Sequence, residues 1–143
     1  MKTLLTHMMI VAVLLFSASM TFAQSNIEVT VKNIEEAKGS IRVGLFANEN
    51  DFLKTPVEGK VVKVAGTEVK VVFENVKAGE YAVSVIHDEN DNGELDTNGL
   101  GIPKEGFAFG NNAMGMFGPP SFEKAKVVVD KTPVKQVIEL KYF

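Results

Sequence analysis

A nine-residue run rich in acidic, amide and glycine residues, 88–96, carries the clearest chemistry in the sequence. Its oxygen-bearing side chains stand at relative positions 1, 3, 5 and 9, as in the first three quarters of an EF-hand-type calcium loop. Alternate side chains of a tightly curled loop point inward, and Gly93 permits the positive φ that the sharp turn needs. The run therefore predicts a calcium site, whose ligands would be Asp88, Asn90, Asn92, Asp96 and the backbone carbonyl of Glu94.

The end of this run departs from the EF-hand pattern. Its twelfth position is Gly99, so the usual bidentate glutamate is missing. A further carboxylate would have to come from Glu105 or Glu123, and Glu105 is the expected ligand. With only two charged ligands in the motif, we expect weak binding, with a dissociation constant of about 10⁻⁴ to 10⁻³ M. The alternative is a metal-free solvated turn, because Asp, Asn and Gly also dominate ordinary turns.

The segment 97–121 has neither a strand period nor a helix period, and it is rich in glycine and large apolar residues. Loops of this length are uncommon inside compact domains and are usually functional or packed as a lid. One interpretation is a lid that folds back over one edge of the domain and brings carboxylates to the calcium loop. The other is an aromatic patch that binds a glycan, a peptide or a partner protein through Phe107, Phe109 and Phe117.

A search for catalytic groups finds little. His87 ends a predicted strand, where it is expected to bond a loop carbonyl; a metal ligand and a general base are the alternatives. The serines at 40, 84 and 121 stand in no nucleophile motif, and no metalloprotease or phosphate-binding motif occurs. A facing pair of Glu105 and Glu123 would be the one route to glycoside hydrolysis. We therefore expect a protein that is not an enzyme.

The elements that must position these residues are strands. Apolar residues alternate with polar ones over much of the chain, which is the period of a strand with one face on a core. The strand at 81–87 is apolar on both faces and is expected to be central in its sheet. Short strands joined by short links predict an all-β, seven-stranded antiparallel β-sandwich of immunoglobulin-like or transthyretin-like type. The predicted strands are residues 27–31, 41–45, 61–64, 69–73, 81–87, 126–129 and 134–142.

The first 23 residues have the pattern of a signal peptide. Lys2 precedes an apolar run from Met8 to Phe16, and small residues precede a cleavage site after Ala23. The run is shorter than the roughly 20 apolar residues that a membrane span needs. Cleavage would leave one domain, residues 24–143, exported to the periplasm or the outer surface, with no membrane span.

Composition narrows the partners of that domain. Residues 24–143 hold 14 basic and 18 acidic side chains, one basic residue fewer than the 15 of the whole chain, because Lys2 is removed. This balance argues against nucleic acid and against anionic membrane surfaces. The chain has no cysteine, so no disulfide braces it and no lipid can be attached at the cleavage site.

Two resemblances add to this interpretation. The phrase Val76 to Val83 resembles a turn and strand found in transthyretin-like and collagen-adhesin B-type modules, where glycine makes the turn and tyrosine starts the strand. Nearly the whole of 24–143 resembles an exported bacterial family, domain of unknown function 2141. The resemblance rests on residues 79–83, 87–93, 96, 101–106, 109, 111–112 and 117–122. It implies export and a β-sandwich, and no catalytic residues; Gly110 departs from a serine expected there.

The sequence thus predicts an exported cell-envelope module that binds calcium weakly, for structural stability or for binding a partner. The alternative is a metal-independent module that binds a glycan or an envelope protein through the aromatic segment 97–122. Neither a ligand nor an individual partner follows from the residues.

Overall fold

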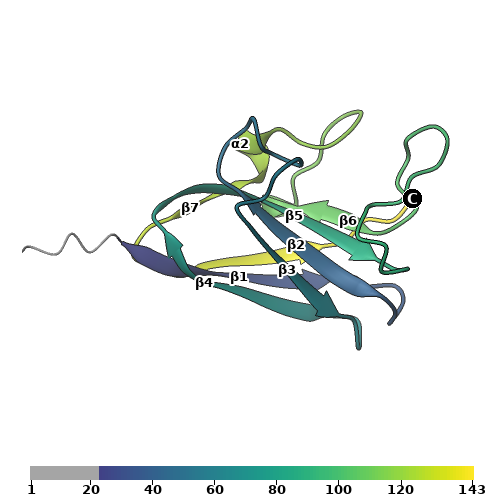
Figure 1. The fold of residues 1–143 in the computed structure, drawn as a ribbon, viewed down its shortest axis with the longest axis horizontal. Coiled ribbons are helices and arrows are strands. Elements are labelled where there is room, and N and C mark those ends of the chain that lie inside the picture. The colour runs from purple at the N-terminus through teal and green to yellow at the C-terminus, as the bar shows by residue number, and fades with distance from the viewer. Residues whose placement is uncertain (1–22) are drawn as a thin grey trace, which may run out of the picture.

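The computed structural model describes residues 23–143, which form two β-sheets packed face to face (Figure 1). The predicted signal peptide lies outside the described residues, except for Ala23. Among residues 23–143, no helix is long and apolar enough to cross a bilayer. The strands are β1 (Gln24–Lys32), β2 (Ser40–Phe46), β3 (Glu58–Lys63), β4 (Val69–Lys77), β5 (Gly79–Asp88), β6 (Phe107–Phe109), β7 (Lys126–Val129) and β8 (Val134–Glu139), and the helical turns are η1 (Gly110–Asn112) and α2 (Phe122–Ala125).

The all-β sandwich is confirmed, but two details of the prediction are wrong. One sheet has the order β4-β1-β8, and the other has the order β3-β2-β5-β6 with β7 also pairing β5. The described chain therefore has eight strands, because β6 lies within the segment predicted to be irregular; its three residues are too few to show a period. The sandwich is also not wholly antiparallel, since β1 and β8 run parallel. They lie far apart in the sequence, so no tight turn forces them to run in opposite directions.

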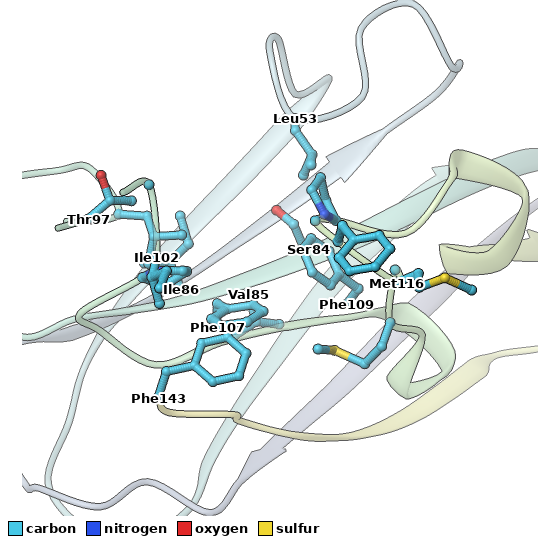
Figure 2. Close-up of a pocket in the computed structure, with 18 of the residues that line it drawn as sticks. Leu53, Ser84, Val85, Ile86, Thr97, Ile102, Phe107, Phe109, Met116 and Phe143 are labelled. Carbon is cyan, nitrogen blue, oxygen red and sulfur yellow. The ribbon is translucent and has the colours of Figure 1, made fainter. Parts of the chain in front are cut away.

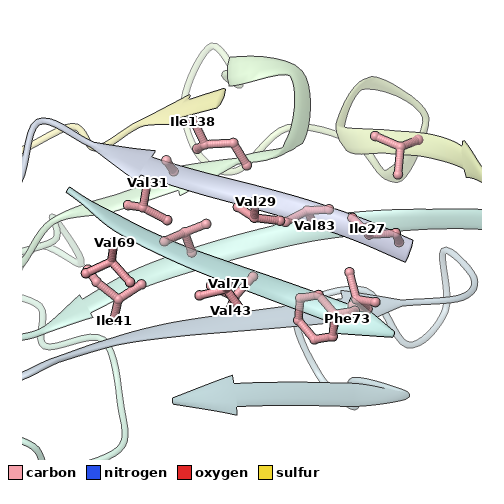
Figure 3. Close-up of a cluster of buried hydrophobic side chains, with 14 of the residues drawn as sticks. Ile27, Val29, Val31, Ile41, Val43, Val69, Val71, Phe73, Val83 and Ile138 are labelled. Carbon is pink, nitrogen blue, oxygen red and sulfur yellow. The ribbon is translucent and has the colours of Figure 1, made fainter. Parts of the chain in front are cut away.

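The core between the sheets is built from the predicted alternation. Ile27, Val29 and Val31 of β1 are fully buried, and they face Val43 and Val83 of the opposite sheet (Figure 3). Burying an aliphatic side chain of this size contributes roughly 1.5–3 kcal/mol. The period-2 pattern thus fixes which face of each strand points inward.

Strand β5 is central, as predicted, with β2 on one side and β6 and β7 on the other. Val83 and Val85 point into the main core, whereas Ala82 belongs to a second cluster on the outer face of the same sheet. That cluster contains Phe46, Ala82, Phe107, Phe109, Phe122 and Ala125. The second cluster explains why both faces of this strand are apolar, and it places aromatic side chains on a face that a simple sandwich leaves to solvent.

The side chain of Asn112 hydrogen-bonds to the backbone along the outer edge of β8. The Asn112 amide donates to the Val137 carbonyl at 3.0 Å and accepts from the Glu139 N–H at 2.8 Å. These are the two bonds that a neighbouring strand would make. The positive φ of Asn112, 52°, lets the short turn η1 bring the amide to this position. The edge is therefore partly protected from pairing with another chain.

Candidate functional site

Asp88 organises the loop 88–96, which leaves the buried end of β5. Its side chain is fully buried, and one carboxylate oxygen accepts from Arg42 Nε at 2.5 Å and from the Gly93 N–H at 2.8 Å. The other oxygen accepts from the Asn92 N–H at 3.0 Å. The loop curls around this carboxylate, which satisfies the N–H groups of the sharp turn that Gly93 makes with φ of 92°.

Electrostatics keep this buried carboxylate ionised. Burial raises the pKa of Asp88, but the Arg42 guanidinium and the N–H groups of Gly93 and Asn92 act in the opposite direction. Together they outweigh burial and hold the pKa of Asp88 below its usual value. Sequence reasoning missed Arg42, although it is the only arginine of the chain and stands among apolar residues of β2.

Three of the predicted calcium ligands, Asn90, Asn92 and Asp96, meet at this loop. The side-chain amides of Asn90 and Asn92 donate to the two oxygens of Asp96 at 2.7 and 2.9 Å. Their own oxygens accept from the N–H groups of Asn92 and Glu94 at 3.1 and 2.9 Å. A bound cation would need amide oxygens turned toward Asp96, where the nitrogens now lie. Within residues 23–143, no three acidic, histidine or cysteine side chains gather in a way that could hold a metal.

Glu105 ties the two ends of the loop together. It is 5% exposed, and its two oxygens accept from the backbone N–H groups of Glu89 and Asp96, each at 2.9 Å. The predicted ligand Glu105 is thus next to the loop, with both oxygens engaged by backbone groups.

Glu105 and Glu123 do not face one another. Glu123 pairs with Lys126 at 2.8 Å, and Lys126 lies opposite Ala82 of β5. Asp88, where the loop begins, stands six positions along the strand from Ala82, and this corresponds to about 20 Å. Paired carboxylates for glycoside hydrolysis lie much closer together.

Further charges fasten the loop to β2 and β3. Asp91 accepts from the Ser40 hydroxyl at 2.5 Å and pairs with Lys63, and the Lys63 ammonium holds the pKa of Asp91 below its usual value. Glu89 pairs with Lys38 at 2.8 Å. The loop is therefore docked on the sandwich by the protein's own cations. The sequence contained a signal for this attachment of the loop. Ser40 and Arg42 are polar residues two positions apart in β2, so they lie on the same face of the strand.

His87 has the structural role expected from the sequence. It is fully buried, with Nε2 2.9 Å from the Lys38 carbonyl and Nδ1 2.8 Å from the Tyr142 hydroxyl. A carbonyl only accepts hydrogen bonds, so Nε2 carries the proton and Nδ1 accepts from Tyr142. Tyr142 is itself partly buried, which raises its pKa. The pair fastens the C-terminal segment to the end of β5.

A groove of about 920 Å³ lies on the outer face of the five-stranded sheet, in the region of the aromatic segment (Figure 2). Its floor includes Ile86 of β5 and Phe107 and Phe109 of β6. Two loops, 97–103 and 113–119, contribute its walls. None of the lining side chains is charged, and the hydroxyls of Ser84 and Thr97 are the only polar groups among them.

The three phenylalanines predicted to bind a partner lie in different parts of this groove. Phe107 and Phe109 are 7% and 8% exposed and belong to the second cluster, whereas Phe117 is 98% exposed on a wall. Part of the segment 97–121 thus packs against the sheet, and part of it reaches into solvent. Sequence reasoning found the aromatic residues but not the groove, because the pairing of β6 with β5 that forms its floor has no sequence pattern.

Comparison with known proteins identifies a family. A family model described as "uncharacterized protein conserved in bacteria (DUF2141)" matches residues 29–137. No curated protein matches the chain, and no solved structure does. The matched range runs from within β1 to within β8 and includes both the loop 88–96 and most of the groove.

We expect Asp88→Asn to lower the free energy of unfolding by about 3 kcal/mol at pH 7, because Arg42 and two N–H groups lose a charged acceptor. The folded pKa of Asp88 lies below its ordinary value of 3.8, so this stabilisation is present above about pH 4 and is lost as the pH falls through the folded pKa. Urea unfolding of both proteins at pH 7 and pH 3 should therefore show a difference that shrinks at the lower pH. The exposed Glu94→Gln serves as the control, with an expected change below about 0.5 kcal/mol.

Glu105→Gln should lower the free energy of unfolding by about 2 kcal/mol, because a glutamine can accept only one of the two N–H bonds and turns an amide nitrogen toward the other. Glu123→Gln removes a surface ion pair whose glutamate side chain is 69% exposed, so its effect should be below about 1 kcal/mol. Thermal and urea unfolding of the two variants give the comparison. Equal losses would show that Glu105 does not clamp the loop.

Proposed function

The chain belongs to the family DUF2141, uncharacterized protein conserved in bacteria, and we propose that it is an exported, non-enzymatic module that binds a hydrophobic ligand in its groove. This function develops the second of the two predicted functions, binding through the aromatic segment 97–122. The observation that carries it is the groove itself, about 920 Å³ in volume with no charged side chain among its lining residues. Ligand pockets typically measure about 300–1,000 Å³ and have mostly apolar walls.

The number of hydrogen-bonding groups in the lining of the groove distinguishes between the ligand classes that the sequence left open. A glycan needs many hydrogen-bonding groups beside an aromatic face, and the groove offers two side-chain hydroxyls, those of Ser84 and Thr97. A hydrocarbon chain or a flat apolar molecule needs few, and burying a polar group without a partner is unfavourable. The ligand class that fits is therefore an uncharged hydrocarbon.

The size of the groove sets the expected affinity. A ligand of about 20 non-hydrogen atoms that gains about 0.3 kcal/mol per atom would bind with about 6 kcal/mol, which corresponds to a dissociation constant of tens of micromolar. Affinity in this range suits a protein that takes up and releases its ligand.

Calcium binding by the loop 88–96 is the second candidate, and the meeting of Asn90, Asn92 and Asp96 favours it. Arg42 already neutralises Asp88, so a divalent ion would find less negative charge than in an EF-hand loop. The loop also leads directly into a groove wall, where the Lys104 N–H donates to the Asp96 carbonyl at 2.8 Å. A bound ion would therefore stiffen that wall.

We also propose that the sandwich is of the immunoglobulin-like or transthyretin-like type. Two features support this: the Gly79 and Tyr81 turn that opens β5, and the packing of a three-stranded sheet on a larger one. Such sandwiches commonly carry their binding residues on loops held by a rigid scaffold.

Binding in the groove can be tested with a fluorescent alkyl-chain dye. Ile86→Lys places a charge on the floor, so it should weaken binding of the dye at least about tenfold, because the ammonium would be buried without a partner. Val61→Lys, at an exposed position on β3, is the matched control and should bind as the wild type does. Circular dichroism confirms that both variants fold. Equal dye binding by the two variants would contradict the proposal.

Calcium binding can be tested by thermal unfolding with millimolar calcium and with a chelator. An ion that binds only the folded loop raises the melting temperature by mass action, and at about ten times the dissociation constant the gain is about 1.4 kcal/mol. Asp96→Asn should abolish the difference between the two conditions. Identical curves for the wild type would remove the calcium candidate and leave the groove proposal intact.

A further inference from the structure

The four most exposed large apolar residues among 23–143 all line one groove. Phe117, Met116, Leu100 and Phe143 are 98%, 89%, 86% and 79% exposed, and together we term them the rim residues. Single exposed apolar side chains are ordinary, but a group of them around one apolar groove marks an interaction site.

Hydrogen bonds within the loop 97–103 hold Leu100 at the tip of that loop. Asn98 Oδ1 accepts from the N–H groups of Leu100 and Ile102 at 2.9 and 3.1 Å, and the Asn98 carbonyl accepts from Gly101 at 2.9 Å. The Asn98 N–H donates to the Ile102 carbonyl at 2.9 Å, which closes the turn. The exposure of Leu100 is therefore a property of a hydrogen-bonded turn.

A second tight turn carries Met116 and Phe117. A Cβ atom at Gly115 would lie 2.2 Å from the Gly118 carbonyl oxygen and 2.5 Å from that of Pro119, so only glycine fits there. The chain doubles back at this point and leaves the two large side chains at its tip. Both loops reach outward toward the top of the view in Figure 1, and the loop 97–103 lies beside the C-terminus.

The chemistry of this surface selects one partner. A protein interface usually contains about one hydrogen bond per 100–200 Å², and the side chains here offer only the hydroxyls of Ser84 and Thr97. A soluble molecule held inside the groove would leave the tip of Phe117 in water. Hydrocarbon that fills the groove and extends beyond it covers both the groove and the tip of Phe117. The net negative charge of residues 24–143 and the absence of charged side chains from the lining favour a lipid surface without net charge.

We propose that the rim residues insert into the surface of a zwitterionic lipid bilayer, so that the groove receives an acyl chain directly from the membrane. This inference rests on the proposed binding of a hydrophobic ligand and names its source. Aromatic and aliphatic side chains gain free energy on entering the boundary between headgroups and acyl chains, and the gain grows with the buried apolar area. The protein would sit on the membrane by its loop tips and would not span it.

Cosedimentation with vesicles of pure zwitterionic phosphatidylcholine tests the inference. The wild type should sediment with the vesicles, and binding should persist at high salt, because insertion of apolar groups is not screened. The triple variant Leu100→Ser, Met116→Ser and Phe117→Ser should lower the partition coefficient about 100-fold. The matched control is Val61→Ser, Val128→Ser and Val137→Ser, which changes exposed valines outside the groove and should sediment as the wild type does. All proteins share the same N-terminal segment, so the comparison isolates the tips.

Three results would overturn the inference: a wild type that stays in the supernatant, a rim variant that sediments like the wild type, or equal losses in the rim and control variants. Light scattering can give a fourth overturning result, in which the wild type self-associates without binding vesicles and the rim variant is monomeric. A second copy of the chain would then cover the rim residues. The dye assay separates this inference from the proposed function. Dye binding without vesicle binding contradicts only the membrane contact. Vesicle binding without dye binding contradicts the ligand site, and with it the uptake of an acyl chain, but leaves the membrane contact standing.

Discussion

The structure depends on one strand, β5, being covered on both of its faces. Its inward side chains complete the core between the sheets, and its outward side chains meet the phenylalanines of β6 and α2. A sheet of a two-layered sandwich normally leaves one face to water. Here the outer face carries a small aromatic core of its own, and the long segment after the loop 88–96 is required to build it. The aromatic core on the outer face does not extend as far as the tips of the loops 97–103 and 113–119, and the groove is the space that remains.

The end of the same strand creates the second constraint. Asp88 is the last residue of a buried strand, so its carboxylate is shielded from water. Its hydrogen-bond donors must therefore come from the protein itself. Arg42 and the N–H groups of the loop supply them, and Glu105 provides acceptors for two further N–H groups on the other side. The curled shape of the loop is thus explained by internal bonds, whether or not an ion joins them. The motif that resembles a calcium loop also has the residues that such a self-contained turn needs.

Sequence reasoning predicted the parts of the fold that have a period. The alternation at 27–31, 41–45 and 69–73 gave strands that the structure confirms, and the two apolar faces of 81–87 correctly indicated a central strand. It could not predict β6, because three residues show no period and their pairing with β5 is decided by long-range packing. Asn90, Asn92 and Asp96 of the predicted ligand set lie together. The cations that hold the loop come from β2, β3 and the turn before β2, whose positions relative to the loop no local pattern reveals. The groove was missed for the same reason, although its aromatic residues were identified.

The pairing of β1 with β8 joins the first strand of the domain to the last. The three-stranded sheet therefore cannot be completed until nearly all of the chain has been synthesised, and contacts this distant in sequence make folding slow. A topology that joins the two ends of the domain thus makes the completion of this sheet a late event in folding.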